Sequence, residues 1–217
     1  MKVLVSWSSG KDSAWMLHRL KQDPSVSIGG LLTTMNEAFD RVAMHAVRRT
    51  MLEAQAEAAE LPLRPVPLPW PCTNEQYEAR MREAVSAALS DGFTHVAFGD
   101  LFLEDVRRYR EDRLQGTGLT PIFPLWGIPT RALAEEMIDG GLRAILTCVN
   151  PSHLDRSFAG REFDRALLRD LPPGIDPCGE RGEFHSFAYD GPMYTRPVTT
   201  ARGDVVDRDG FVFADLL

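Results

Sequence analysis

The stretch LVSWSSGKDSAWMLHRLK, residues 4–21, decides which fold the sequence predicts. An apolar run over residues 3–5 stops at Ser6, and apolar residues at helical spacing begin after Ser13. A strand therefore leads into a helix through a short turn rich in serine and glycine. Backbone N–H groups and the positive end of the helix dipole meet at such a helix start. The turn thus predicts a phosphate-binding site at residues 8–13.

Composition and charge indicate a globular protein without a nucleic-acid partner. The 217 residues are 44% hydrophobic, enough for one sizeable packed domain and a small appendage. The formal net charge of −7 offers no electrostatic footprint for a nucleic-acid backbone. We see neither an apolar run of about 18 residues nor a signal peptide, so we expect a soluble, cytoplasmic protein with no membrane partner. Three cysteines lie far apart without a C-x-x-C pair, which argues against a disulfide framework or a zinc site: Cys72, Cys148 and Cys178.

Short apolar runs alternate with amphipathic stretches along most of the chain. Strands are expected near residues 3–7, 28–34, 64–68, 94–99 and 143–149. Helices are expected near residues 12–21, 43–60, 74–90, 104–115 and 130–139. This order predicts an α/β domain over residues 1–150, a parallel sheet covered by helices on both faces, with ligands at the carboxyl ends of the strands. Residues 151–217 predict a helix near 160–171 and short β-like pieces, which we interpret as a smaller α+β substrate domain.

The turn fits neither of two common nucleotide-binding loops. A Walker A loop needs a glycine five positions before Gly10 and a Ser or Thr after Lys11, but Val5 and Asp12 stand there. A dinucleotide fingerprint needs three glycines, and only one is present. The remaining pattern, S-S-G-K-D-S, resembles the S-G-G-x-D-S loop of the ATP pyrophosphatases.

The residue types of this loop suit the binding of ATP. Three serines can supply hydroxyl donors: Ser8, Ser9 and Ser13. Gly10 lets the backbone approach phosphate, Lys11 adds positive charge, and Asp12 can hold Mg²⁺ against the phosphates. Ser9 stands where that family has a glycine, and its Cβ disfavours a positive φ angle.

Two later motifs extend the resemblance. They are FGDLFLEDVRRYREDRLQGTGLTPIFPLWG at residues 98–127 and CGERGEFHSFAYDGPMY at residues 178–194. Together with SWSSGKDSA at residues 6–14, they resemble the diphthine–ammonia ligase-like branch of the ATP pyrophosphatase superfamily. The resemblance covers residues 2–194, and it implies a HUP-type nucleotide-binding sheet with strand order 3-2-1-4-5.

The resemblance also implies a reaction. ATP, with Mg²⁺, would adenylate a carboxylate and release pyrophosphate, and ammonia would then displace AMP to form an amide. No glutaminase domain is visible, so we expect free ammonium as the nitrogen source. The acceptor stays open between protein-borne diphthine and other carboxylates, because GERGEFHSF differs from the G-E-G-G-E-Y-E-T-L pattern of true ligases. A homodimer stays open too, as do an ATP pyrophosphatase with another acceptor and a non-catalytic adenine-nucleotide sensor.

Strand ends and one helix supply further candidate residues. Gly99 and Asp100 end the fourth strand, and Asp100 would position the metal, the adenylate or the amine unless it only caps the next helix. Thr33 ends the second strand, where the resemblance implies backbone contacts with adenine. Tyr109 and Arg113 lie four apart on one helix and could bind phosphate or substrate, although an exposed helix face explains them nearly as well.

A histidine and a late segment complete the candidates. His45 is a candidate substrate contact, although a lone histidine is more often a surface or capping residue. Glu180, Glu183 and His185 lie in a segment that glycines interrupt. We expect these three to come within reach of the nucleotide, with Glu183 and His185 dividing acid–base and substrate-binding roles.

Overall fold

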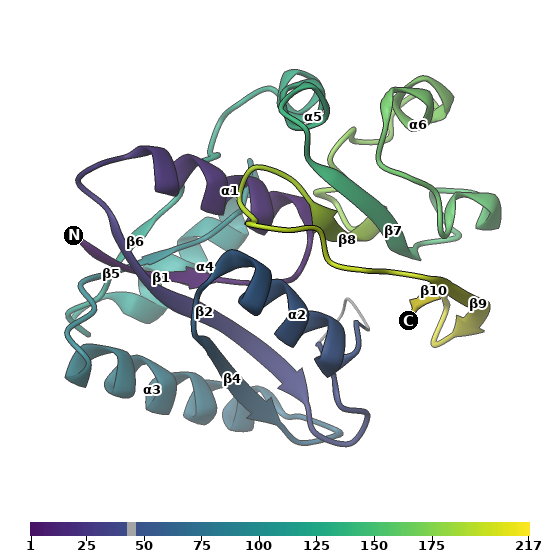
Figure 1. Cartoon of the computed structure of the whole chain (residues 1–217). Coiled ribbons are helices and arrows are strands. Elements are labelled where there is room, and N and C mark those ends of the chain that lie inside the picture. Colours follow the sequence, from purple (N-terminus) through teal and green to yellow (C-terminus); the bar gives the residue numbers. More distant parts are fainter. Residues whose placement is uncertain (43–46) are drawn as a thin grey trace.

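A computed structural model describes residues 1–42 and 47–217, which form two β-sheets with a shared hydrophobic core (Figure 1). The first sheet contains β1 (Lys2–Ser6), β2 (Ser27–Asn36), β3 (Arg41–Val42), β4 (Leu63–Leu68), β5 (His95–Ala97) and β6 (Thr120–Ile122). β1 lies between β2 and β5, β4 pairs with β2, and β6 pairs with β5, all in parallel. The short β3 runs antiparallel to the end of β2.

Helices cover both faces of this sheet. Those next to the first sheet are α1 (Lys11–Gln22), α2 (Arg49–Ala59), α3 (Asn74–Ser90) and α4 (Glu104–Leu114). The described residues also form α5 (Thr130–Asp139), α6 (Arg165–Asp170) and a 3₁₀ turn, η1 (Arg156–Phe158). Successive side chains of β1 point to opposite faces of the sheet, so each face packs against its own layer of helices. Val3 and Val5 are buried with apolar residues of α1 and α2, whereas Leu4 is buried with residues of α3 and α4.

The second sheet is antiparallel and is built from the later part of the chain. Its order is β8–β7–β10–β9, with β7 (Arg143–Val149), β8 (Phe184–Asp190), β9 (Arg202–Arg208) and β10 (Phe211–Leu216). Figure 1 shows α5 and α6 beside β7. Apolar residues of both sheets belong to one buried cluster. β8 packs against α1, which brings the second sheet to the first.

The α/β fold class is confirmed, as is the order of the first four expected strands, 3-2-1-4. The place predicted for residues 143–149, as the fifth strand of the first sheet, is wrong. These residues form β7 of the second sheet, and β6 occupies the edge of the first sheet beside β5. Six of the seven β7 residues are buried. A continuous apolar run shows burial on both faces but does not identify the partner strands, and the three residues of β6 are too few to show a pattern.

The later part of the chain differs from expectation in two places. The helix expected at 160–171 is shorter, because the Asp164 side chain caps α6 through the Leu167 N–H and Pro172 follows its end. Residues 184–190 form the strand β8, whose bounds the sequence did not predict. The second sheet begins with β7, before residue 150. The division of the chain into two domains at residue 150 stays a prediction. Within the described part of the chain, no helix is both long and apolar enough to span a membrane.

Candidate functional site

The turn between β1 and α1 presents the start of a helix to a cavity. Gly10 occupies the N-cap position without a side-chain hydrogen bond to the helix. Ser9, just before it, adopts a left-handed conformation with a φ of 70° and is completely buried. The first N–H groups of a helix have no partners within the helix, so this arrangement suits an anion.

Serine hydroxyls shape the same turn. Ser8 Oγ donates to Ser13 Oγ over 3.3 Å, and Ser13 Oγ donates to the Gly10 carbonyl over 2.9 Å. Ser9 Oγ is different, because it is buried without a hydrogen-bond partner among the described residues. Ser8 and Ser13 therefore face the cavity, whereas Ser9 only shapes the backbone.

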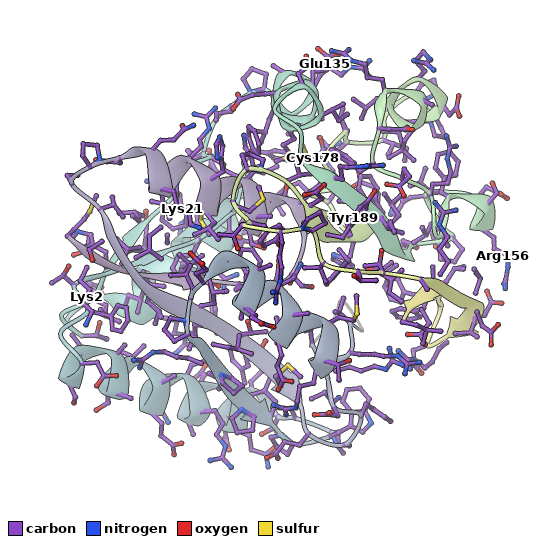
Figure 2. All side chains as sticks on the ribbon, in the orientation of Figure 1. Lys2, Lys21, Glu135, Arg156, Cys178 and Tyr189 are labelled. Carbon is purple, nitrogen blue, oxygen red and sulfur yellow. The ribbon has the colours of Figure 1, made fainter. Side chains whose placement is uncertain are left out.

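Lys11 ties the turn to a distant segment. Its side chain is 2% exposed, and Nζ contacts the Asp12 carboxylate at 2.8 Å and donates to the carbonyl oxygen of Cys178. Burial alone would lower the pKa of Lys11, but the neighbouring Asp12 carboxylate helps to raise it above its usual value. Cys178, labelled in Figure 2, also donates through Sγ to the Thr130 carbonyl at the start of α5. Lys11 is therefore a charged link between the turn and residues 176–183.

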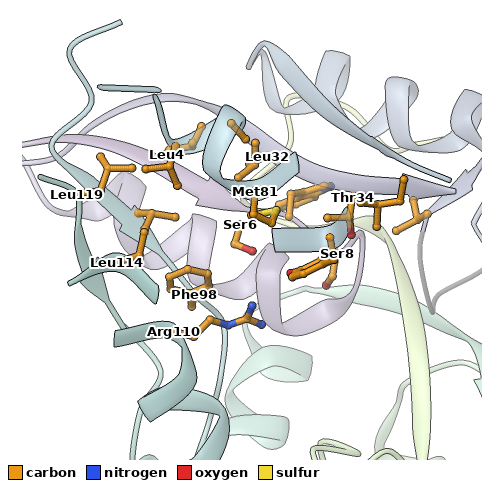
Figure 3. A pocket seen from close by; sticks show the side chains of 17 residues that line it. Leu4, Ser6, Ser8, Leu32, Thr34, Met81, Phe98, Arg110, Leu114 and Leu119 are labelled. Atoms are coloured by element: carbon orange, nitrogen blue, oxygen red, sulfur yellow. The ribbon is translucent and has the colours of Figure 1, made fainter. Parts of the chain in front are cut away.

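Two cavities meet at the turn. The long cavity, of about 420 Å³, runs beneath α3 along the face of the first sheet. Figure 3 shows apolar Leu4 and Leu119 near one end and polar Ser8 and Thr34 near the other. The loop cavity, of about 310 Å³, is lined by residues of the turn, of the β5 end and of β8. The two cavities adjoin each other and share four lining residues: Ser6, Ser8, Phe98 and Arg110.

The end of β5 packs closely against the start of α1. A Cβ atom on Gly99 would lie 3.3 Å from the Asp12 carbonyl carbon and 3.3 Å from the Ser13 nitrogen. Gly99 therefore allows this close approach. Asp100 follows it and lines the loop cavity, where its carboxylate accepts a 3.4 Å hydrogen bond from Arg110. The Arg110 guanidinium also stacks 4.7 Å from the Phe98 ring, which holds a positive charge where both cavities meet.

Glu180 reaches across to the first sheet from the late segment. Its carboxylate accepts a hydrogen bond of 2.8 Å from the Leu101 N–H and lines the loop cavity. Burial, together with the Asp12 and Asp100 carboxylates, raises the pKa of Glu180 to about 7 against the opposing Leu101 hydrogen bond and Lys11 charge. A carboxyl group that titrates near neutral pH is suited to proton transfer.

Glu183 is buried but does not line the loop cavity. Its two carboxylate oxygens accept hydrogen bonds from the N–H groups of Asp176, at 3.0 Å, and Arg181, at 2.9 Å. Its own carbonyl accepts from the Asn150 N–H at 2.9 Å. The expected acid–base role of Glu183 is therefore not supported by its position. The carboxylate instead closes the turn that presents Glu180.

β8 adds two groups to the loop cavity. His185 lines it, and burial, with a smaller effect from Lys11, lowers the pKa of His185 to about 4, so the ring is neutral at pH 7. Ser186 Oγ accepts a hydrogen bond of 3.2 Å from the Lys11 N–H in the first turn of α1. The second sheet thus contributes directly to the loop cavity.

Gln55 is a site residue that sequence reasoning missed. Its side chain on α2 is completely buried, and Nε2 donates to the carbonyls of Ser9, at 2.9 Å, and Ala188, at 2.6 Å. Its Oε1 accepts from Trp7 Nε1 at 3.0 Å. The sequence could have indicated this residue, because the polar Gln55 lies four residues after Met51 and four before Ala59, on a helix face that is otherwise apolar.

Several expected site residues lie elsewhere. Thr33 is buried and its hydroxyl donates to the Trp7 carbonyl at 2.7 Å, while its neighbour Thr34 lines the long cavity. Tyr109 and Arg113 line a groove between α3 and α4 that adjoins the long cavity at Arg110, but neither of these two residues lines the long cavity or the loop cavity. Arg113 there pairs with Glu78 at 2.6 Å. His45 lies outside the described residues.

The chain is similar to known proteins over both of its parts. Residues 1–119 match the family described as diphthamide synthase N-terminal domain, and residues 129–208 match the diphthamide synthase C-terminal domain. A Bos taurus protein named diphthine–ammonia ligase is 25% identical over an alignment 236 positions long, which covers 99% of this chain and 88% of the relative. Proteins of the same name from Danio rerio and Schizosaccharomyces pombe are 34% and 24% identical over 52% and 95% of this chain. Those two matches cover 46% and 37% of the relatives' own lengths.

Proposed function

This chain belongs to the diphthamide synthase family, and we propose that it is an ATP-dependent amide ligase that joins ammonia to a carboxylate and forms AMP and pyrophosphate. One observation carries the proposal from the family to this chain. The start of α1, Arg110 and Glu180 all line the loop cavity. That space therefore combines anion-binding groups with a carboxyl group that titrates near pH 7.

The first step forms an acyl-adenylate. An oxygen of the acceptor carboxylate attacks the α-phosphorus of ATP, and the bond from this phosphorus to the bridging oxygen of the β-phosphate breaks. The N–H groups at the start of α1 and the hydroxyls of Ser8 and Ser13 would hold the departing pyrophosphate. Arg110, where the two cavities meet, would offset the charge that develops on the α-phosphate.

Two carboxylates fit Mg²⁺ as part of the same proposal. The described residues contain no preformed group of three metal ligands. Mg²⁺ commonly uses only one or two protein carboxylates beside substrate phosphates and water. The Asp12 and Asp100 side chains, 26% and 16% exposed, line the loop cavity and would serve this role. When bound, the ion would neutralise phosphate charge.

The second step forms the amide. The nitrogen of ammonia attacks the acyl carbon, the bond from this carbon to the oxygen of AMP breaks, and AMP leaves with that oxygen while the new amide nitrogen releases one proton to water. Before this attack, ammonium must itself lose a proton. We assign this proton to Glu180, whose pKa of about 7 allows it to accept protons near neutral pH. His185 is neutral at that pH and would orient the acceptor without adding charge.

The proposal includes a cytoplasmic location, which the free thiols of all three cysteines favour.

Product analysis tests this function. Wild-type protein, supplied with ATP, Mg²⁺, ammonium and a diphthine-bearing protein, should form AMP and pyrophosphate in equal amounts, separable by chromatography. Arg110→Ala should lower kcat/KM for ATP about 10²-fold, because it removes the positive charge that would stabilise the reacting phosphate. Arg113→Ala is the matched control and should stay within about twofold, because Arg113 lies outside both cavities.

Other products would lead to other conclusions. Formation of ADP and phosphate would rule out adenylation. ATP binding with no turnover across a panel of carboxylates would favour the nucleotide sensor. AMP formation with a different carboxylate, but not with diphthine, would identify an ATP pyrophosphatase with another acceptor.

A further inference from the structure

The apolar stripe of α3 lies between two open spaces. Tyr77, Met81 and Val85, each four residues from the next, line both the long cavity and the groove between α3 and α4, which measures about 450 Å³. Among the 17 residues of α3, all of which the structure describes, Ala88 alone is buried. An apolar stripe on a surface helix normally packs against the core. Here the stripe is accessible to whatever enters the long cavity.

Hydrogen bonds at the start of α3 fix the backbone that carries Tyr77. The Gln76 N–H donates to Thr73 Oγ at 3.2 Å, and the Thr73 N–H donates to Gln76 Oε1 at 2.9 Å. The Tyr77 N–H donates to the Thr73 carbonyl at 2.9 Å. A capping box of this kind satisfies N–H groups that a helix otherwise leaves free. The Tyr77 side chain therefore projects from an ordered first turn.

Tyr77 and Arg110 meet between the long cavity and the groove. Both side chains line each of these spaces, and Arg110 lines the loop cavity as well. Burial raises the pKa of the Tyr77 hydroxyl, and the positive charge of Arg110 opposes this rise. The guanidinium acts on the hydroxyl from close by, because the effect of a partly exposed charge falls off steeply with distance. The start of α3 is thus linked to the charged group at the junction of the two cavities.

The other contacts of Arg110 do not fix it for phosphate binding. Figure 3 shows Arg110 beside Phe98, and the guanidinium lies 4.7 Å from the ring centroid. Asp100 accepts a long hydrogen bond of 3.4 Å from it. The proposed function also assigns Asp100 to Mg²⁺, so the ion would compete with Arg110 for this carboxylate. A tyrosine hydroxyl can accept a hydrogen bond from a guanidinium without neutralising its charge.

We propose that Tyr77 is a positioning residue, which holds the Arg110 guanidinium toward the reacting phosphate and leaves its charge available there. The inference rests on the proposed function, because it uses the role given there to Arg110. It adds that α3 takes part in phosphate recognition through a residue that touches no phosphate itself. Tyr77 should therefore matter for ligands that carry phosphates and not for the nucleoside alone.

Two binding probes test this difference without turnover. They are an ATP analogue with a methylene group between the α- and β-phosphates, and adenosine, each measured by isothermal titration calorimetry in the presence of Mg²⁺. Tyr77→Phe keeps the ring and removes the hydroxyl, so it should raise the Kd of the analogue about fivefold and change that of adenosine less than about twofold. Glu78→Gln is the matched control on the same helix turn. It removes an ion pair of 2.6 Å with Arg113 in the groove and should leave both Kd values unchanged.

A double-mutant cycle shows whether Tyr77 acts through Arg110. In the Arg110→Ala background, Tyr77→Phe should change the Kd of the analogue less than about twofold, because the group that it positions is gone. A residue that only supports the fold would instead weaken binding by the same factor in both backgrounds. Equal factors would therefore overturn the inference.

The remaining outcomes separate this inference from the proposed function. An unchanged Kd for the analogue in Tyr77→Phe, or equal weakening of the analogue and adenosine, would also overturn it. If the analogue and adenosine respond differently as expected but wild-type protein forms no AMP from ATP, the proposed function fails and the positioning role stands. If AMP forms but the wild type and Tyr77→Phe bind the analogue equally, the reverse holds. Circular dichroism checks each fold, and Tyr77→Leu, which also lacks the hydroxyl, gives a second route should Tyr77→Phe not fold.

Discussion

The side-chain amide of Gln55 donates a hydrogen bond of 2.9 Å to the carbonyl oxygen of Ser9 in the turn between β1 and α1. The same nitrogen donates to the Ala188 carbonyl on β8, and the Ala188 N–H donates back to the Ser9 carbonyl at 3.0 Å. A single buried side chain on α2 thus joins the turn to the second sheet. The conformation of the turn therefore depends on groups that come from three distant parts of the chain.

Replacing Gln55 should affect both stability and nucleotide binding. Gln55→Leu leaves the buried Trp7 Nε1 without its acceptor, so we expect the free energy of unfolding to fall by about 2 kcal/mol. The KM for ATP should rise about tenfold, with a smaller change in kcat, because the variant loosens the turn without removing a reacting group. Urea denaturation and steady-state kinetics measure the two effects. Gln115→Leu, at an exposed position, should change neither, and equal behaviour of the two variants would refute a positioning role for Gln55.

Ser9→Gly should stabilise the protein. Ser9 has a φ of 70°, a conformation that costs a residue with a Cβ about 1–2 kcal/mol, and its buried hydroxyl has no described partner. Glycine removes both penalties, so we expect the free energy of unfolding to rise by about 1 kcal/mol or more after the entropy cost of glycine. Ser9→Ala removes only the hydroxyl and should gain less than Ser9→Gly. Denaturation midpoints of the three proteins give the order, and a less stable glycine variant would contradict the assignment of strain.

Glu180 should make stability fall as pH rises toward neutrality. A glutamate has a pKa of about 4.3 in an unfolded chain, whereas the pKa of Glu180 in the folded protein is about 7. Between these values the folded state binds more protons than the unfolded state, so the free energy of unfolding decreases with increasing pH. Glu180→Gln removes this dependence. As the pH rises from 5 to 8, the free energy of unfolding of the variant should therefore increase by about 2 kcal/mol relative to that of the wild type. This value is discounted because Glu180 is partly exposed.

Denaturation at both pH values measures this difference, with the exposed Glu53→Gln as a control for the loss of one carboxylate. A matching kinetic effect is expected. The rise of kcat/KM for amide formation through about pH 7 should flatten in Glu180→Gln if Glu180 accepts the proton from ammonium. Parallel pH profiles for wild type and variant would remove Glu180 from the proton-transfer step.

Local patterns were sufficient for much of the fold. The spacing of apolar residues predicts α3 and α5 at the residues where they are found, because helix periodicity repeats within a few turns and needs no distant partner. The S-S-G-K-D-S turn likewise lies between one strand and one helix that adjoin it in sequence. By contrast, β7 and β8 depend on strand partners far along the chain, and their sheet membership was not predictable from their own residues.

The amino-acid sequence by itself determined the strand–turn–helix unit at residues 2–22 and the approximate place of most helices, since these depend on contacts within about a dozen residues. It also indicated the family of the chain. Tertiary structure decided which carboxylate faces the cavity. Glu180 and Glu183 are three residues apart and chemically alike, yet one reaches the Leu101 N–H across the loop cavity while the other is held by the N–H groups of its own turn. Only the packing of the two sheets separates these roles, because the direction of each side chain follows from partners that the local sequence does not contain.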